Sequence, residues 1–334
     1  MLPVTTRNIS LNTIRAAAET VYEAAVRTPL VRLDAPVDDR GPGAARRTPQ
    51  IFLKLETLQP IGSFKIRGAY NAIRRLTPEQ LAGGVWTVSA GNAAQGVALA
   101  ARMVGAPCSV LVMDTAPATK LRAIERLGAT IVTASYDECW RTVEQRGSDR
   151  MRGHFVHPFD DDDFISGNGT IGLEIHEDLP EVDAVVAPLG GGGLLAGIGY
   201  ALHALAPDAR VYAAEPATAA PLATSLRAGR ASYFEGWQAS FVDGAGGRSV
   251  LDSMWPLLSE RVSDSIVVTL EEAARAMALA AERNHVIAEG AAACAVAAAL
   301  SPEFIARGHQ TIVAVVSGGN IDLTRFAQLV GACS

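Results

Sequence analysis

Apolar runs alternate along the chain with segments whose apolar residues recur at helical spacing. The spacing of three and four residues predicts helices over 92–105, 116–128 and 194–206. The intervening runs are rich in β-branched residues and apolar throughout, as strands are when both faces of a parallel sheet are covered. These predicted strands occupy 84–89, 108–113, 129–134, 183–189, 210–216 and 310–317. The pattern predicts an α/β fold of open, twisted and mostly parallel sheets.

One part of the chain forms a strand–helix series of its own. Residues 83–159 hold a βαβαβ pattern, which predicts a small domain inserted into a larger one made of 1–82 and 160–334. The 334 residues are enough to bury two separate cores. We therefore expect two domains.

Composition excludes several kinds of partner. The chain is 49% hydrophobic and 19% charged with a net charge of −6, and its Lys and Arg are scattered. Neither nucleic acid nor an anionic membrane surface is therefore expected as a partner. The most apolar run, 288–300, carries Glu289 and is too short to span a bilayer. Four cysteines lie far apart and residues 1–25 lack an apolar signal core, which predicts a cytoplasmic protein.

The strongest local motif is PLGGGGLLAG, at 188–197. Gly190, Gly191, Gly192 and Gly193 remove every Cβ between a predicted strand and a predicted helix. Backbone N–H groups there can converge on an anion at the positive end of the helix dipole. The motif matches neither the dinucleotide fingerprint nor a P-loop. A tight turn requires fewer glycines, so we interpret the motif as a phosphate site.

Two further turns follow predicted strands, and ligands of α/β proteins bind at such strand ends. In VSAGNAAQG (88–96), Ser89 or Asn92 either caps the next helix or joins free N–H groups in binding a carboxylate. In VVSGGNID (315–322), Ser317 ends the last strand, where side chains face a cleft. A plain loop is the alternative interpretation there.

A lysine in an unusual setting completes the set. Lys65 lies in GSFKIRGA (62–69), between an aromatic and a β-branched residue. Burial of a charged lysine is costly, whereas a lysine that is neutral or condensed with an aldehyde suits such neighbours. A reactive amine, a phosphate cup, a carboxylate-binding turn and a hydroxyl at a strand end are together what pyridoxal phosphate and an amino-acid substrate require.

The chain resembles the fold-type II pyridoxal-phosphate enzymes, which have the tryptophan synthase β-like fold. Within them it is similar to the branch of threonine/serine dehydratases (ammonia-lyases) and serine racemases. The resemblance covers nearly the whole chain and implies that the cofactor lies in the cleft between two sheet domains. The motifs that carry it are RTPLVRL (27–33), KLETLQPIGSFKIRGAYNAI (54–73), TVSAGNAAQGVALAA (87–101), APATKLRAIERLGA (116–129), HPFDD (157–161), GNGTIGLEI (167–175), PLGGGGLLAGI (188–198), AAEP (213–216), VDGAG (242–246), AEGAAA (288–293) and SGGN (317–320).

The resemblance also implies a role for each residue of these motifs. Lys65 would bond to the cofactor aldehyde, with Phe64 beside the cofactor and Asn92 bonded to its ring hydroxyl. The other implied contacts are Gly190, Gly191, Gly192, Gly193 and Leu194 with the phosphate, Ser317 with the pyridine nitrogen, Gly244 with the ring region, Glu289 near the pyridine side, and Ser89, Ala90, Gly91, Asn92 and Ala93 with the substrate carboxylate.

The implied reaction is a β-elimination that converts a β-hydroxy-α-amino acid, such as L-threonine or L-serine, to a 2-oxo acid and ammonia. Lys65 would take the α-proton. Racemases of this branch carry a serine where this chain has Ala90, which favours one-base elimination over racemisation. Ala93 stands where the family usually has histidine, so the backbone N–H remains but side-chain selectivity differs.

Several alternatives stay open beside this interpretation. An amino-acid racemase is one, and a dehydratase for a larger substrate such as an aryl serine or hydroxyaspartate is another. A dehydrogenase would use the glycine turn for a dinucleotide but leaves Lys65 unexplained, and intact Asn92 and Ser317 disfavour a cofactor-binding protein without turnover. A homodimer is implied by the resemblance alone.

The divalent-cation site of the branch is matched only in part. Glu215 and the Ala219 carbonyl correspond to two ligands, but the aspartate position holds Pro221. Oxygen ligands suit Mg²⁺ or Ca²⁺, and loss of a carboxylate weakens the binding of both. We therefore expect no firm metal ligand. The acidic run 160–163, after His157, is interpreted as a solvated surface turn.

Overall fold

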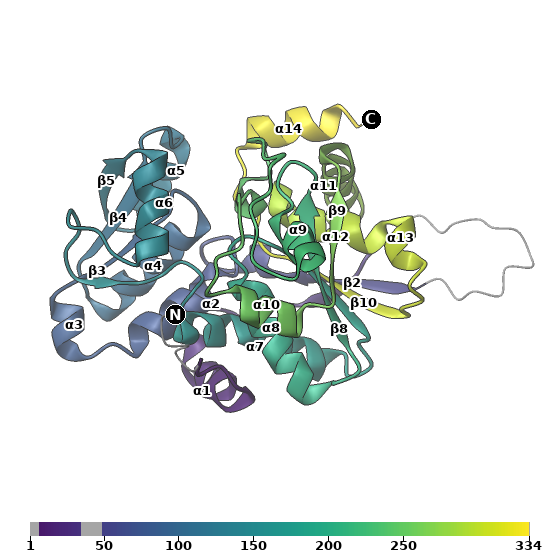
Figure 1. Ribbon diagram of the computed structural model, residues 1–334, viewed down its shortest axis with the longest axis horizontal. Coiled ribbons are helices and arrows are strands. Elements are labelled where there is room, and N and C mark those ends of the chain that lie inside the picture. The colour runs from purple at the N-terminus through teal and green to yellow at the C-terminus, as the bar shows by residue number, and fades with distance from the viewer. Residues whose placement is uncertain (1–6, 35–48, 334) are drawn as a thin grey trace, which may run out of the picture.

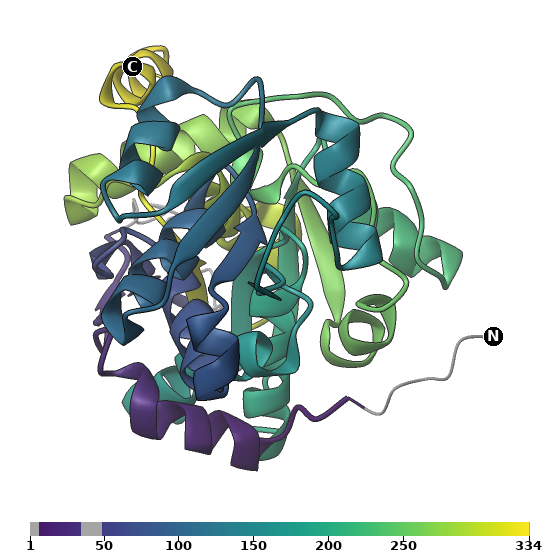
Figure 2. The same ribbon diagram turned by 90° about the vertical axis from the view of Figure 1, so that its left-hand side faces the viewer.

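The computed structural model describes residues 7–34 and 49–333 and contains two sheets in two lobes (Figure 1). Turned by 90°, the smaller lobe lies in front of the larger one (Figure 2). The strand order is β1-β2-β10-β7-β8-β9 in the large sheet and β5-β4-β3-β6 in the small sheet. In chain order the strands are β1 (Leu30–Arg32), β2 (Gln50–Leu55), β3 (Val85–Val88), β4 (Cys108–Met113), β5 (Thr130–Ala134), β6 (His154–Phe155), β7 (Ala184–Pro188), β8 (Arg210–Pro216), β9 (Asp264–Val268) and β10 (Thr311–Val316).

Helices follow most strands, as βαβ connections between parallel strands require. There are two short 3₁₀ helices, η1 (Glu56–Leu58) and η2 (Asp243–Ala245). The α-helices are α1 (Leu11–Val21), α2 (Lys65–Arg74), α3 (Pro78–Ala82), α4 (Asn92–Val104), α5 (Ala118–Glu125), α6 (Tyr136–Gln145), α7 (Asp162–Asp178), α8 (Gly193–Leu205), α9 (Pro221–Ala228), α10 (Trp255–Arg261), α11 (Leu270–Asn284), α12 (Gly290–Leu300), α13 (Pro302–Ile305) and α14 (Leu323–Gly331).

The large sheet is parallel except for its edge strand β1, and helices cover both of its faces. Alternate residues of β10 show the division, because successive side chains of a strand point to opposite faces. Ile312 and Ala314 belong to the core beneath α11 and α12, whereas Val313 and Val315 belong to the core beneath α7, α8 and α10. Burial of both faces explains why this strand is apolar throughout.

The small sheet is parallel and is covered in the same way. Val85 and Val110 pack beneath α4, while Trp86 and Leu111 pack beneath α6. The core beneath α4 also contains apolar residues of α2 and Phe164 of α7. Because α2 packs on both α4 and α7, it joins the two lobes.

The α/β fold with parallel-rich sheets agrees with the prediction, and the predicted strands and helices lie within a few residues of the observed ones. The predicted domain boundaries, 1–82 with 160–334 and 83–159, remain a prediction; the strands of the small sheet run from 85 to 155. The predicted surface turn at 157–163 is wrong. His157 and Asp160 are buried, Asp161 caps α7, and Asp160 accepts hydrogen bonds from Arg7 and Ser253.

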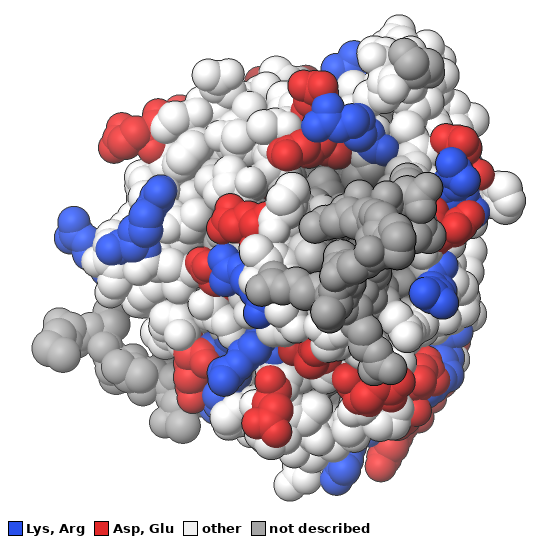
Figure 3. Space-filling model, turned by 90° about the vertical axis from the view of Figure 1, so that its right-hand side faces the viewer, with Lys and Arg blue, Asp and Glu red and all other residues white. Residues whose placement is uncertain are grey.

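Acidic and basic side chains are interspersed over the face drawn in Figure 3 rather than gathered by sign. None of the helices within 7–34 and 49–333 combines the length and apolar content that a membrane span requires.

Candidate active site

A cavity of about 370 Å³ lies between the two sheets, at the carboxyl ends of β3, β7 and β10. Parallel strands bring their carboxyl ends to one edge of a sheet, which is why turns far apart in sequence meet there. Every residue that the sequence analysis assigned to the cofactor or to the substrate lines this cavity: Phe64, Lys65, Ser89, Ala90, Gly91, Asn92, Ala93, Gly190, Gly191, Gly192, Gly193, Leu194, Gly244, Glu289 and Ser317.

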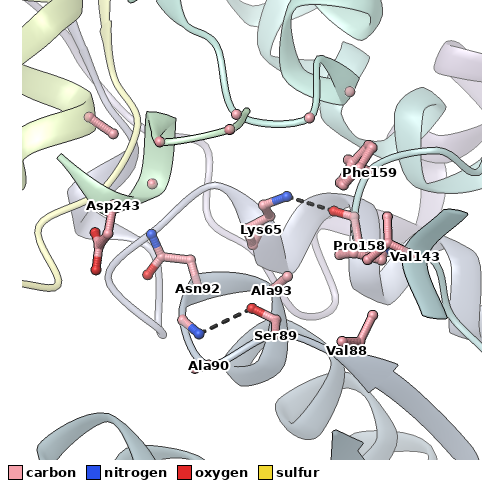
Figure 4. Close-up of a pocket in the computed structure, with 18 of the residues that line it drawn as sticks. Lys65, Val88, Ser89, Ala90, Asn92, Ala93, Val143, Pro158, Phe159 and Asp243 are labelled. Carbon is pink, nitrogen blue, oxygen red and sulfur yellow. Dashed lines mark hydrogen bonds between the residues drawn. The ribbon is translucent and has the colours of Figure 1, made fainter. Parts of the chain in front are cut away.

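Lys65 is the first residue of α2, and its amine faces the cavity. Its Nζ donates a hydrogen bond of 2.6 Å to the carbonyl oxygen of Pro158 (Figure 4). The same atom lies 5.2 Å and 5.3 Å from the ring centres of Phe64 and Phe164. Burial lowers the pKa of Lys65 to about 8, against the opposing charge of Glu289. A substantial share of this amine is therefore neutral near physiological pH.

The other lysines of the chain differ from Lys65 in their partners. The sequence holds three lysines in all. Lys54 is fully buried with its Nζ 2.6 Å from a carboxylate oxygen of Glu174, and Lys120 pairs with Asp243. Among the described residues, Lys65 is the one lysine without a carboxylate partner. An amine whose only partner is a carbonyl is available for covalent chemistry.

A buried ionic cluster holds the start of α2 in place. The guanidinium of Arg67, two residues after Lys65, lies between the carboxylates of Glu56 and Glu174 at 2.8 Å and 2.6 Å. All three side chains are fully buried, and Lys54 completes the cluster. Because each charge is paired and hydrogen-bonded, the cluster can exist in the core and fixes α2 against β2 and α7.

The glycine turn runs from β7 into α8 with no room for side chains. Gly192 has a φ of +94°, which favours glycine, and a Cβ on Gly190 would lie 2.8 Å from the carbonyl oxygen of Gly244. A Cβ on Gly191 would clash with the ring of Phe159. The amides of 190–192 donate to no acceptor among the described residues, and they stand at the N-terminus of α8. The turn is therefore suited to an anion.

Asn92 is held from both ends of its amide. Its Nδ2 donates to Glu289 at 2.8 Å, and its Oδ1 accepts from Asn320 at 2.7 Å. Burial, together with the charge of Asp243, raises the pKa of Glu289 to about 7. The side chain of Asn92 is thereby oriented before any ligand binds.

The last strand delivers Ser317 to the cavity beside the lysine segment. The carbonyl of Ser317 accepts a hydrogen bond from the amide of Phe64 at 3.0 Å, and Ser63 pairs with Gly318 in an isolated bridge. The Ser317 hydroxyl has no hydrogen-bond partner within 7–34 and 49–333 and remains free for a polar group in the cavity.

The turn after β3 leaves the N-terminus of α4 open. The cap of α4 is Gly91, which makes no side-chain cap hydrogen bond, so the alternative that Ser89 or Asn92 caps the helix is wrong. The Ser89 hydroxyl instead accepts from the Gly91 amide at 3.1 Å (Figure 4). The N–H groups at the start of α4 are thus available to a carboxylate.

The partial cation site lies outside this cavity. Glu215, at the end of β8, is fully buried, and its oxygens accept from the Leu222 and Ala223 amides at 2.8 Å and from the Ser265 hydroxyl at 2.5 Å. Among the described residues, no cluster of three metal-ligating side chains occurs. The donors around Glu215 supply hydrogens to its carboxylate, so the residues present, with the Ala219 carbonyl, do not fit a divalent cation.

Several residues of the site were missed by the sequence analysis. Pro158 acts through its carbonyl, which no sequence pattern reveals, although its neighbours in HPFDD carried the resemblance. Asn320 is the last residue of the motif SGGN, and a polar side chain after two glycines at a strand end could have indicated a residue of the site. The pairing of Lys120 with Asp243 across the cleft depends on the arrangement of the two lobes.

The arrangement fits pyridoxal phosphate. A free amine, an N–H cradle without Cβ atoms, an oriented amide and a free hydroxyl surround one cavity, and these match the aldehyde, phosphate, ring hydroxyl and ring nitrogen of that cofactor. A second N–H cluster at α4 matches the carboxylate of an amino acid.

Comparisons with known proteins agree with this geometry. The profile of one family, described as pyridoxal-phosphate dependent enzyme, matches residues 21–318. An L-threonine ammonia-lyase of Thermotoga maritima is 40% identical over 283 residues, which are 84% of this chain and 70% of that protein. A serine racemase of Homo sapiens is 40% identical over 280 residues, 82% of each chain. The structure of maize serine racemase matches with a TM-score of 0.85 and 34% identity over 97% of each chain.

Proposed function

Because the chain belongs to the pyridoxal-phosphate-dependent enzyme family, we propose that it eliminates water from a β-hydroxy-α-amino acid such as L-threonine or L-serine. The products are a 2-oxo acid and ammonia. The observation that carries the proposal is the amine of Lys65, which has no carboxylate partner among the described residues and lies in one cavity with a glycine cradle and an open helix N-terminus. Relatives named threonine ammonia-lyase and threonine dehydratase support it.

The cofactor, when bound, supplies an electron sink for the charge that develops at the α-carbon. We assign its phosphate to the amides of 190–194, its ring hydroxyl to Asn92, its ring nitrogen to Ser317, and its ring surroundings to Phe64, Gly244 and Glu289. Ser317 is a neutral group and cannot hold a proton on the ring nitrogen as a carboxylate does. The site therefore suits substrates whose β-leaving group departs readily.

Lys65 is assigned the role of general base. Its Nζ accepts the α-proton of the substrate, and a pKa of about 8 leaves about a tenth of the amine neutral at pH 7. Proton transfer by a positioned group accelerates a reaction by roughly 10²–10⁴-fold. The buried pairing of Arg67 holds the backbone that carries this amine.

The start of α4 is assigned to the substrate carboxylate. The N–H groups of Asn92 and Ala93 carry the positive end of the helix dipole, and the Ser89 hydroxyl, which accepts from the Gly91 amide, can donate its own hydrogen to the carboxylate. This dock orients the α-carbon toward Lys65. The enamine released after loss of water hydrolyses to the 2-oxo acid and ammonia.

Racemisation is the second candidate, favoured by the relatives named serine racemase. It requires a second proton donor on the face of the substrate opposite Lys65. Ala90, which lines the cavity beside the carboxylate dock, ends in a methyl group and cannot transfer a proton. Elimination with one base is therefore the better supported reaction. We further propose a cytoplasmic homodimer without a resident divalent cation.

Covalent trapping tests the central assignment. The purified holoenzyme is reduced with borohydride and digested, and mass spectrometry locates the cofactor on one of the three lysines. We expect the label on Lys65, retained in Lys120→Ala and lost in Lys65→Ala. The same preparations are given L-threonine and L-serine, with the 2-oxo acid followed continuously.

Two results would contradict the proposal. A label on Lys54 or Lys120 in the native chain would remove Lys65 as the reactive amine. Cofactor bound at Lys65 without any 2-oxo acid from a β-hydroxy amino acid, but with inversion of the α-carbon on chiral analysis, would replace elimination by racemisation.

A further inference from the structure

The cavity has two ends of different chemical character. On one side of Lys65 lie Asn92, Asp243, Glu289 and Lys120, which are polar or charged. On the other side lie Val88, Val143 and Phe159 (Figure 4). Phe159 also packs against Gly191 of the phosphate turn, whereas Val88 and Val143 have no counterpart among the cofactor contacts, so this end of the cavity is open to a group of the substrate.

The apolar end is built by both lobes, and six of its residues carry the argument. Cys139 and Val143 are four residues apart on α6 and so share one face of that helix. Val88 and Met113, at the ends of β3 and β4, line the same end of the cavity. Val88, Cys139 and Val143 belong to the small-lobe core, and Met113, Phe159 and Leu251 pack against that core. Met113, Phe159 and Leu251 are partly buried side chains that line the cavity, and ligand sites are typically lined by apolar side chains of this kind.

The reacting amine adjoins this end. The Lys65 Nζ bonds to the carbonyl of Pro158, the residue before Phe159. The substrate carboxylate is anchored at the start of α4, so a substrate whose α-carbon faces Lys65 can direct its β-substituent toward Val143 and Phe159. A methyl or a hydrogen leaves that surface in contact with water, whereas a ring covers it.

Within the described part of the chain, the same cavity offers no free cation beyond Lys65 to a second carboxylate of a substrate. Of the described residues that line it, Lys65 and Lys120 are the cations, and Lys120 is paired with Asp243. A β-carboxylate pointing to the apolar end would lose its hydration without gaining a partner.

We propose that this enzyme acts on a β-hydroxy-α-amino acid whose β-carbon carries an aryl group or an apolar group of similar size. The proposal rests on the proposed elimination and names its substrate class. Burial of a phenyl ring rather than a methyl group against this surface raises kcat/KM by roughly tenfold or more. Val88, Met113, Cys139, Val143, Phe159 and Leu251 are the residues that determine this preference.

The test compares L-threo-3-phenylserine, L-threonine and threo-3-hydroxyaspartate as substrates of the holoenzyme, with each 2-oxo acid quantified. We expect kcat/KM to be at least about tenfold higher for phenylserine than for threonine, and lowest for hydroxyaspartate. Threonine equal to or better than phenylserine would overturn the substrate class and leave the elimination standing. No 2-oxo acid from any β-hydroxy substrate, with the cofactor bound, would overturn the elimination and this inference together.

A variant localises the preference to the apolar end. Val143→Phe fills the space beside Phe159, and we expect the ratio of kcat/KM for phenylserine to that for threonine to fall about tenfold or more. Val267→Phe is the matched control, because Val267 is exposed on β9 outside the cavity, and it should leave the ratio unchanged. An unchanged ratio in Val143→Phe would refute the assignment of these residues.

Discussion

The amine of Lys65 should capture cofactor at a pH where an ordinary lysine does not. Burial lowers its pKa to about 8, and only the neutral amine attacks an aldehyde. At pH 7 about a tenth of such an amine is neutral, whereas an exposed lysine with a pKa near 10.4 is roughly 0.04% neutral. Lys65 therefore has about 200 times more reactive amine than a surface lysine at the same pH.

The assay mixes apoenzyme with pyridoxal phosphate and follows the visible absorbance of the lysine-bound cofactor in a stopped flow between pH 6 and pH 10. Each rate is divided by the rate constant that N-acetyl-lysine methylamide shows per neutral amine at the same pH, which removes the titration of the cofactor itself but keeps that of Lys65. We expect the rate to rise about tenfold per pH unit below the pKa of Lys65 and to level off near pH 8. A rate that rises without a plateau up to pH 10 would refute the argument from burial.

Glu289→Gln sharpens this prediction. The charge of Glu289 stabilises the protonated amine, so its removal lowers the pKa of Lys65 further and moves the plateau to a lower pH. The glutamine side chain still offers an oxygen to Asn92, which keeps the hydrogen bond. A plateau that moves to higher pH in this variant would contradict the assigned electrostatics.

Three other changes have definite expected outcomes. Arg67→Met leaves two buried carboxylates short of a partner and should lower the free energy of unfolding by about 3–5 kcal/mol, measured by urea denaturation; a loss equal to that of the exposed Arg275→Met would contradict the role of the cluster. Gly191→Ala brings a Cβ against the ring of Phe159, and should weaken cofactor binding at least about tenfold in a spectroscopic titration, whereas unchanged affinity would mean that the turn does not cradle the phosphate. EDTA should leave activity unchanged, because the carboxylate of Glu215 already accepts hydrogen bonds from two amides of α9. Activity that is lost with EDTA and restored by Mg²⁺ would contradict this prediction.

Two kinds of signal in the sequence were sufficient to locate the site. Unbroken apolar runs between helical segments predicted parallel strands, and the carboxyl ends of such strands converge by geometry. The turn at 188–197 and Ser317 could therefore be assigned to one place by their positions at predicted strand ends, and the segment around Lys65 was added by its chemistry; all three contribute residues to the cavity. Each of these signals is local, because a run of glycines or a lysine among apolar neighbours can be recognised within a segment of ten residues.

The contacts between distant segments were decided only by the tertiary structure. The hydrogen bonds from Lys65 to Pro158 and from Asn92 to Glu289 join residues 93 and 197 positions apart, and no local pattern encodes either. The burial of Asp160 likewise follows from its contacts with Arg7 and Ser253, and that of His157 includes a hydrogen bond with the carbonyl of Val143.

The character of the substrate end has the same origin. Apolar residues of α6, β3 and β4 read in sequence as ordinary core, and most of them are core. They face a cavity because the small sheet is packed with its strand ends toward the glycine turn of the large sheet. The sequence determined which chemistry the site carries, through residues whose properties are local. The packing of the two sheets determined which substrate fits the site, because the shape of a cavity depends on how the elements around it are placed.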